Sequence, residues 1–106
     1  MSENIYEANL RNLFHTVVET GVGTVREGDL YRWLGAARAR EAFWKEIYQY
    51  FYEALSGREK KEGWQLWFVE ASGNFNFVCF EPSASIEKPV WWKKINEDGR
   101  VNFGKW

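Results

Sequence analysis

The segment from residue 37 to residue 56 predicts a helix with too many apolar side chains for one narrow face. At 100° per residue these side chains spread over about 160° of the helical wheel, and Tyr52 widens the arc to about 200°. They are Phe43, Trp44, Ile47, Tyr48, Tyr50, Phe51, Ala54 and Leu55. Such a helix must pack on two sides, for instance against another helix and a sheet, or against a second subunit.

A first helix is predicted over residues 3–20, where apolar side chains recur at helical spacing on one stripe. Gly21 ends this helix, because glycine readily adopts the left-handed conformation found at helix C-termini. The segment 21–23 is then predicted to be a turn. This helix is a candidate for one of the two surfaces that the helix over 37–56 requires.

A short second helix is predicted between these two. Thr24 and Glu27 have the spacing of a capping box, in which the hydroxyl and the carboxylate each satisfy a free backbone N–H. Asp29 is the alternative start, because Gly28 disfavours a helix interior. In both versions the helix ends at Gly35.

Two β-hairpins are predicted after a charged linker over residues 57–63. The first joins 64–70 to 75–81, which are rich in aromatic and β-branched residues, and its turn places Glu70 opposite Phe75. Both faces of this strand pair are apolar. An antiparallel pair covered on one side only would alternate more regularly, so we expect its second face to be covered at least in part.

The second hairpin joins 90–95 to 100–106 across a turn in which Asp98-Gly99 supplies the turn residues. Pairing directly across this turn would divide the side chains between two faces. One set is Val90, Trp92, Lys94, Val101, Phe103 and Lys105, and the other is Trp91, Lys93, Ile95, Arg100 and Asn102. The two adjacent tryptophans would then point to opposite faces, so at most one of them belongs to a core shared with the helices.

The order of these elements predicts an α+β fold. Two to three N-terminal helices would pack on a C-terminal four-stranded antiparallel sheet made of the two hairpins. Helices that precede the strands, rather than alternating with them, argue against a parallel βαβ fold. We expect a single domain over 1–106, with a helical half at 3–56, the linker at 57–63 and a β half at 64–106.

Few side chains suited to catalysis or metal binding are present. His15 and Cys79 are the only residues of their types. His15 falls on the polar side of the first helix and Cys79 within an apolar strand, so a Cys–His nucleophilic pair is not expected. One His and one Cys cannot supply the four ligands of a structural zinc site, and no calcium or phosphate-binding loop is recognisable. We expect a non-enzymatic protein without catalytic residues, cofactor or metal site.

The chain is expected to be cytoplasmic. Its first ten residues contain neither the basic nor the apolar region of a secretory signal. No apolar run approaches the ~20 residues of a membrane helix, so no membrane partner is expected. A single cysteine cannot form an internal disulfide, which fits a reducing compartment.

The aromatic content points to binding. Of the 106 residues 20 are aromatic, and seven of these are tryptophan. Each ring buries about 150–250 Å², so a small domain cannot hide all of them, and exposed apolar patches commonly mark interfaces. We expect a protein-interaction module that acts as a dimer or as a subunit of a larger assembly. The expected binding residues are Trp91, Trp92, Lys93, Lys94, Arg100 and Trp106 in the final hairpin, with Tyr52 as a second choice.

The alternative is a nucleic-acid-binding protein. Residues 88–106 carry five basic and two acidic side chains, a net charge of +3, whereas the preceding residues carry −4. The order of helices and hairpin is compatible with a winged helix, and the final hairpin could instead stack bases on its rings. The outward arc of the helix over 37–56 is about neutral, which is unfavourable for a phosphate-rich groove.

Overall fold

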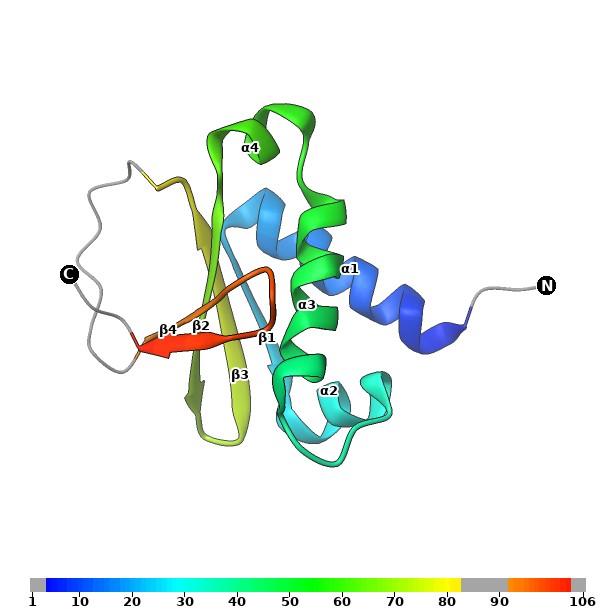
Figure 1. Cartoon of the computed structure of the whole chain (residues 1–106). Coiled ribbons are helices and arrows are strands. Elements are labelled where there is room, and N and C mark those ends of the chain that lie inside the picture. The colour runs from blue at the N-terminus through cyan, green and yellow to red at the C-terminus, as the bar shows by residue number, and fades with distance from the viewer. Residues whose placement is uncertain (1–3, 83–91, 104–106) are drawn as a thin grey trace.

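A computed structural model of the chain describes residues 4–82 and 92–103 (Figure 1). These residues form four helices and one five-stranded antiparallel sheet, so the predicted α+β class is confirmed. The helices are α1 (Ile5–Thr20), α2 (Glu27–Leu34), α3 (Glu41–Ala54) and α4 (Gly57–Glu62). The strands are β1 (Val22–Arg26), β2 (Gln65–Ala71), β3 (Asn74–Phe80), β4 (Lys93–Ile95) and β5 (Val101–Phe103).

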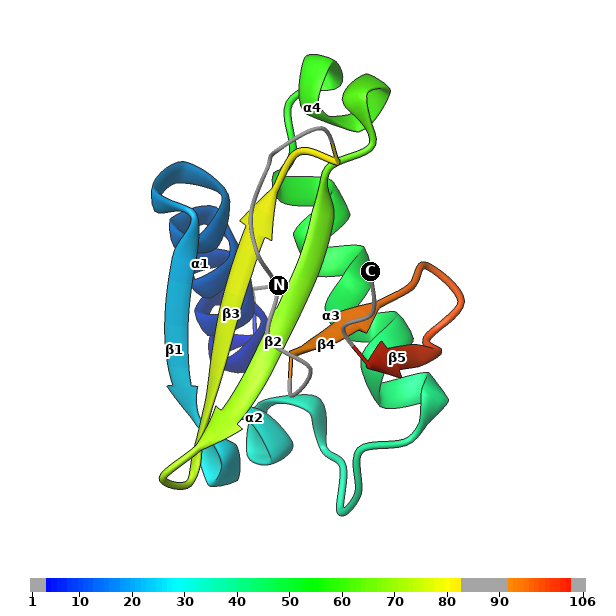
Figure 2. The same cartoon turned by 90° about the vertical axis from the view of Figure 1, so that its left-hand side faces the viewer.

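The sheet has the strand order β1-β3-β2-β4-β5, and both predicted hairpins belong to it because β4 pairs with β2. Figure 1 views the sheet from its edge, with α1, α2 and α3 on one side, and Figure 2 looks onto the opposite face. Among the described residues, none of the helices is both long enough and apolar enough to span a bilayer.

Helix α3 packs on two sides, as its wide apolar arc predicts. On one side the Trp44 ring stacks on Phe68 of β2, with centroids 4.4 Å apart. On another side α3 lies against α1, and Ile47 and Phe51 are fully buried in the shared core. The helix begins later than predicted, at Glu41, and ends at Ala54.

The structure contains a strand that the sequence pattern does not predict. Gly21 ends α1 in the left-handed conformation, as expected, but residues 22–26 continue as β1 and pair with β3. Thr24 lies inside this strand, where its hydroxyl donates a hydrogen bond to Asn76 Oδ1 at 2.9 Å. The predicted turn and capping box are therefore wrong. β1 is held by backbone pairing with a strand whose residues lie 48 to 56 positions later in the chain, which no local signal reveals.

Helix α2 begins at Glu27 without a side-chain cap, so the alternative start at Asp29 is also wrong, and it ends at Gly35 as predicted. The predicted linker over 57–63 is helix α4. Ser56 caps it: the Ser56 hydroxyl accepts from the Glu59 N–H at 3.2 Å, and the Glu59 carboxylate accepts from the Ser56 N–H at 2.8 Å. A capping box is therefore present at the start of α4, whereas the sequence interpretation placed one at the start of α2.

The register of the first hairpin is confirmed, with Glu70 opposite Phe75. The register of the second is shifted by one residue, because Ile95 pairs with Val101 instead of Arg100. Asn96 N–H donates to the Arg100 carbonyl at 2.9 Å, so the loop has three residues and ends at the left-handed Gly99. A left-handed glycine at this position forms a bulge, and a slip of one residue moves the β5 side chains to the other face. The predicted division of side chains between the two faces is therefore wrong for β5.

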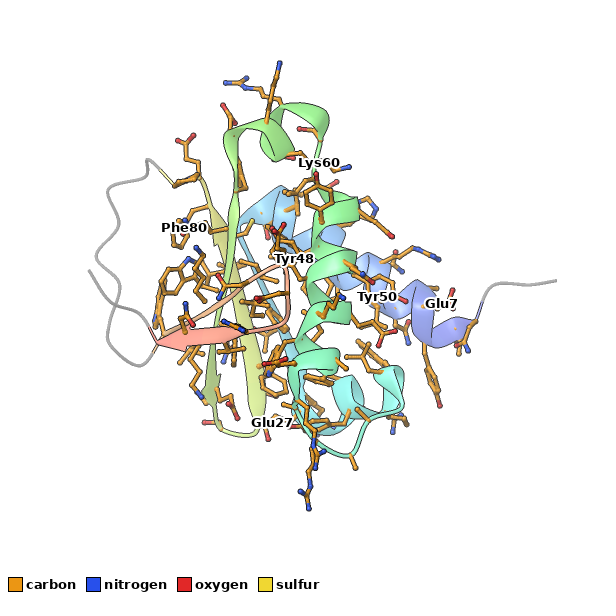
Figure 3. All side chains as sticks on the ribbon, viewed as in Figure 1. Glu7, Glu27, Tyr48, Tyr50, Lys60 and Phe80 are labelled. Atoms are coloured by element: carbon orange, nitrogen blue, oxygen red, sulfur yellow. The ribbon has the colours of Figure 1, made fainter. Side chains whose placement is uncertain are left out.

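Two aromatic rings are buried on the sheet face that points away from the helices. Trp67 and Phe80 are exposed by only 5% and 6%, and their rings stack with centroids 6.0 Å apart. Figure 3 shows Phe80 on this side of the sheet. The expectation that the second face is covered in part is confirmed for these two residues.

The tip of the second hairpin sits against the start of α3, and this contact allows a test by substitution. A Cβ at Gly99 would clash with the Glu41 carbonyl oxygen, whereas a Cβ at Gly73, also left-handed, would meet no atom. Both alanine substitutions incur about 1–2 kcal/mol for the left-handed backbone. We expect Gly99→Ala to lower the free energy of unfolding by about 1–3 kcal/mol more than Gly73→Ala does, measured by urea denaturation. Equal losses of unfolding free energy in the two variants would contradict the packing of the hairpin tip against α3.

Candidate functional site

Of the three predicted binding tryptophans, only Trp92 lies within the described residues. Trp91 and Trp106 lie outside the described residues, so their roles remain predictions. Trp92 directly precedes β4 and is half-buried. Trp92 does not line the cavity at the β4–β5 hairpin or the two hollows beside Tyr52.

Lys93 is engaged in contacts within the chain. Its Nζ lies 3.4 Å from Glu70 Oε1 and 5.7 Å from the centre of the Phe68 ring. The side chain is half-buried at the point where β4 pairs with β2. These contacts assign it to packing between the strands.

Lys94 and Arg100 line one cavity, which we call the hairpin notch. It lies between the beginning of β2 and the β4–β5 hairpin and has a volume of ≈ 540 Å³. Its lining includes Tyr48, Trp64, Gln65, Lys94, Arg100 and Asn102. Tyr48 belongs to α3, so the notch joins the hairpin to the outward side of that helix.

Tyr52 is an exposed ring that its neighbours hold in place. Its exposed fraction is 45%. The Tyr48 ring, one helical turn earlier, stacks with it at 6.3 Å, and the Lys60 Nζ of α4 lies 4.8 Å from its centre. Figure 3 shows Tyr48 and Lys60 on the same side of α3. We call Tyr48 and Tyr52 the tyrosine ridge.

Two hollows flank the tyrosine ridge, and both include Tyr52. The basic hollow, ≈ 720 Å³, is lined by Tyr52, Gly57, Arg58, Lys60 and Lys61. The acidic hollow, ≈ 480 Å³, is lined by Tyr48, Gln49, Tyr52, Glu53 and Glu97. Burial, followed by the charge of Glu97, raises the pKa of Tyr48. A phenol is in any case protonated at neutral pH, so Tyr48 can donate a hydrogen bond.

The structure thus gathers three of the seven predicted binding residues around Tyr48. Lys94 and Arg100 share the hairpin notch with it, and Tyr52 shares the acidic hollow. The sequence interpretation counts Tyr48 as a packing residue only. Its spacing of four from Tyr52, at the edge of the apolar arc, was the available signal.

Comparison of the chain with protein-family models, curated protein sequences and solved structures found no match.

The outward side of α3 is acidic. Its exposed charged side chains are Glu41, Lys45, Glu46 and Glu53. A recognition helix needs positive charge facing the phosphates. This charge disfavours the winged-helix alternative.

Cys79 and His15 do not meet, as predicted. Cys79 is buried and its thiol lies 3.2 Å from the Val17 carbonyl oxygen, whereas His15 is exposed. Burial, with a smaller contribution from the charge of Glu59, raises the pKa of the thiol to about 11. Within residues 4–82 and 92–103, no group of three or more His, Cys, Asp or Glu side chains is placed to hold a metal ion.

Two carboxyl groups meet where α2 approaches the end of β2. A hydrogen bond to Glu70, followed by burial and the charge of Glu70, raises the pKa of Glu27. Lys93 also lies beside Glu70, with its Nζ 3.4 Å from Glu70 Oε1. We interpret this pair as a pH-dependent contact between two elements of the fold.

The buried thiol predicts slow chemical labelling. The thiolate is the reactive form, and a pKa of about 11 leaves very little of it at neutral pH. We expect a disulfide reagent to modify Cys79 slowly in the folded protein and rapidly in denaturant. Rapid labelling of the folded protein would contradict the buried position.

The Glu27–Glu70 contact predicts a pH dependence of stability. The pKa of Glu27 is higher in the folded protein than its ordinary value of 4.5, so the folded state binds more protons and its stability falls as pH rises above that value. Glu27→Gln should therefore gain stability relative to wild type between about pH 4 and pH 7, measured by thermal unfolding. Glu46→Gln, an exposed control on α3 that lines none of the cavities named above, should follow wild type. Identical slopes for Glu27→Gln and wild type would exclude the contact.

Proposed function

We propose that this chain is a non-enzymatic protein-binding module whose contact surface is the tyrosine ridge with the adjoining hairpin notch. The observation that carries the proposal is the Tyr52 ring, which is 45% exposed although it lies against the Tyr48 ring and the Lys60 ammonium group. Ordering a mobile side chain on binding costs about 0.5–1.5 kcal/mol. A ring already restricted by its neighbours avoids part of that cost.

The composition of the surface supports a protein partner. Tyrosine, tryptophan and arginine are enriched among the residues that dominate binding energies at protein interfaces. Tyr52 projects between two hollows, and Arg100 lies at the hairpin notch, so side chains of a partner have space beside each. The mixed charge of this surface supports a protein more than a nucleic acid, because a phosphate backbone requires net positive charge.

A pair of tyrosine substitutions tests the proposal. Tyr6, on α1, is 37% exposed and serves as a matched control for Tyr52. The tagged wild-type chain, Tyr52→Ala and Tyr6→Ala would each be used to capture proteins from the host cell. We expect Tyr52→Ala to reduce recovery of the bound protein at least about tenfold, the effect of a 1.4 kcal/mol contact, and Tyr6→Ala to leave it unchanged.

Two results would contradict the proposal. Equal recovery with all three chains would show that the tyrosine ridge is not the contact surface. Binding of single- or double-stranded oligonucleotides that weakens steeply with salt would favour the nucleic-acid alternative instead. We expect no such binding at low salt.

A further inference from the structure

The charges around Tyr52 are divided by sign. The basic hollow contains three basic side chains, Arg58, Lys60 and Lys61. The acidic hollow contains two carboxylates and no basic side chain among its lining residues. The exposed ring of Tyr52 lies between them, so one surface presents opposite charges on the two sides of an aromatic residue.

The fold of α4 creates the basic side. Neither of its glutamates lines the basic hollow: the Glu59 carboxylate accepts from the Ser56 N–H, and Glu62 accepts from the Trp64 indole at 3.1 Å and from Arg58, itself a lining residue, at 3.3 Å. Both glutamates line a different cavity, towards the end of α1. Lys60 and Lys61 therefore determine the charge next to Tyr52.

Long-range packing creates the acidic side. Glu53 belongs to α3 and Glu97 to the loop of the second hairpin. Gly99 in the same loop packs closely against the Glu41 carbonyl, so the loop lies beside α3. Both carboxylates are exposed, so they are available to a partner.

We propose that the partner of this surface is a second copy of the chain, related by a two-fold axis beside Tyr52. The basic hollow of each copy then faces the acidic hollow of the other. A two-fold interface must be complementary to itself, because residue i contacts residue j and j contacts i across the axis. Opposite charges on the two sides of Tyr52 satisfy this condition.

Charge complementarity favours a second copy over a partner of uniform charge. A uniformly acidic partner would be repelled by Glu53 and Glu97, and a uniformly basic one by Lys60 and Lys61. The same exposed charges make association sensitive to salt, since screening acts over about 8 Å at physiological ionic strength. This inference rests on the proposed function, because it assigns a partner to the same surface.

Reversal of the charges tests the arrangement. One variant carries Lys60→Glu and Lys61→Glu, and the other carries Glu53→Lys and Glu97→Lys. Each variant alone would place like charges at both contacts of its dimer. We expect each to dimerise at least about tenfold more weakly than wild type, by sedimentation equilibrium at low salt.

Mixing the two variants is the decisive measurement. In the mixed pair both contacts again join opposite charges, so we expect a heterodimer with affinity near that of wild type, detected by native mass spectrometry. The control variant carries Arg38→Glu and Glu19→Lys, which reverse two exposed charges outside the hollows, and should dimerise as wild type does. Circular dichroism of every variant verifies folding.

Three results would overturn the inference. They are a monomeric wild-type chain at up to about 100 µM, a dimer unaffected by either reversal, and weakened variants that do not associate when mixed. If wild type captures a protein other than a second copy and Tyr52→Ala fails to recover it, the proposed function stands and only the second copy is rejected. If neither experiment detects binding through Tyr52, both proposals fail.

Discussion

The stacking of Trp44 on Phe68 is the contact on which the arrangement of the layers depends. With centroids 4.4 Å apart, it joins α3 to β2, the central strand of the sheet. Phe75 packs edge-on against both rings, at 5.6 and 5.8 Å. The apolar arc of α3 is too wide for one neighbour, so α1 covers the side that the sheet leaves open.

The packing of α3 on the sheet and on α1 also determines which side of α3 stays exposed. With Ile47 and Phe51 turned inwards, Tyr48 is left at the boundary and Tyr52 faces outwards. The hairpin tip closes against the start of α3 and brings Glu97 to the same side. The candidate binding surface is thus a product of core packing, because its members come from α3, α4 and the second hairpin.

The sequence predicted part of this surface. Tyr52 stood out because it widens an apolar arc that was already too wide, and Lys94 and Arg100 stood out as basic residues next to aromatic ones. Lys93 was assigned to the same surface, yet pairing of β4 with β2 places it against Phe68 and Glu70. Trp91 and Trp106, which were also among the predicted binding residues, lie outside the described residues and remain predictions.

Local signals were sufficient at some places where the physical cause is local, although the capping box of α4 and the one-residue slip at Gly99 are also local and were missed. Gly21 and Gly35 end helices because glycine tolerates a left-handed backbone. The predicted loop over 71–74 gave the correct register of Glu70 with Phe75, although the strands continue to Ala71 and Asn74 and leave a two-residue turn. The partner of β1 and the charge division around Tyr52 required the folded chain. Each depends on the free energy of contacts between residues far apart in the sequence, which periodicity and turn residues do not encode.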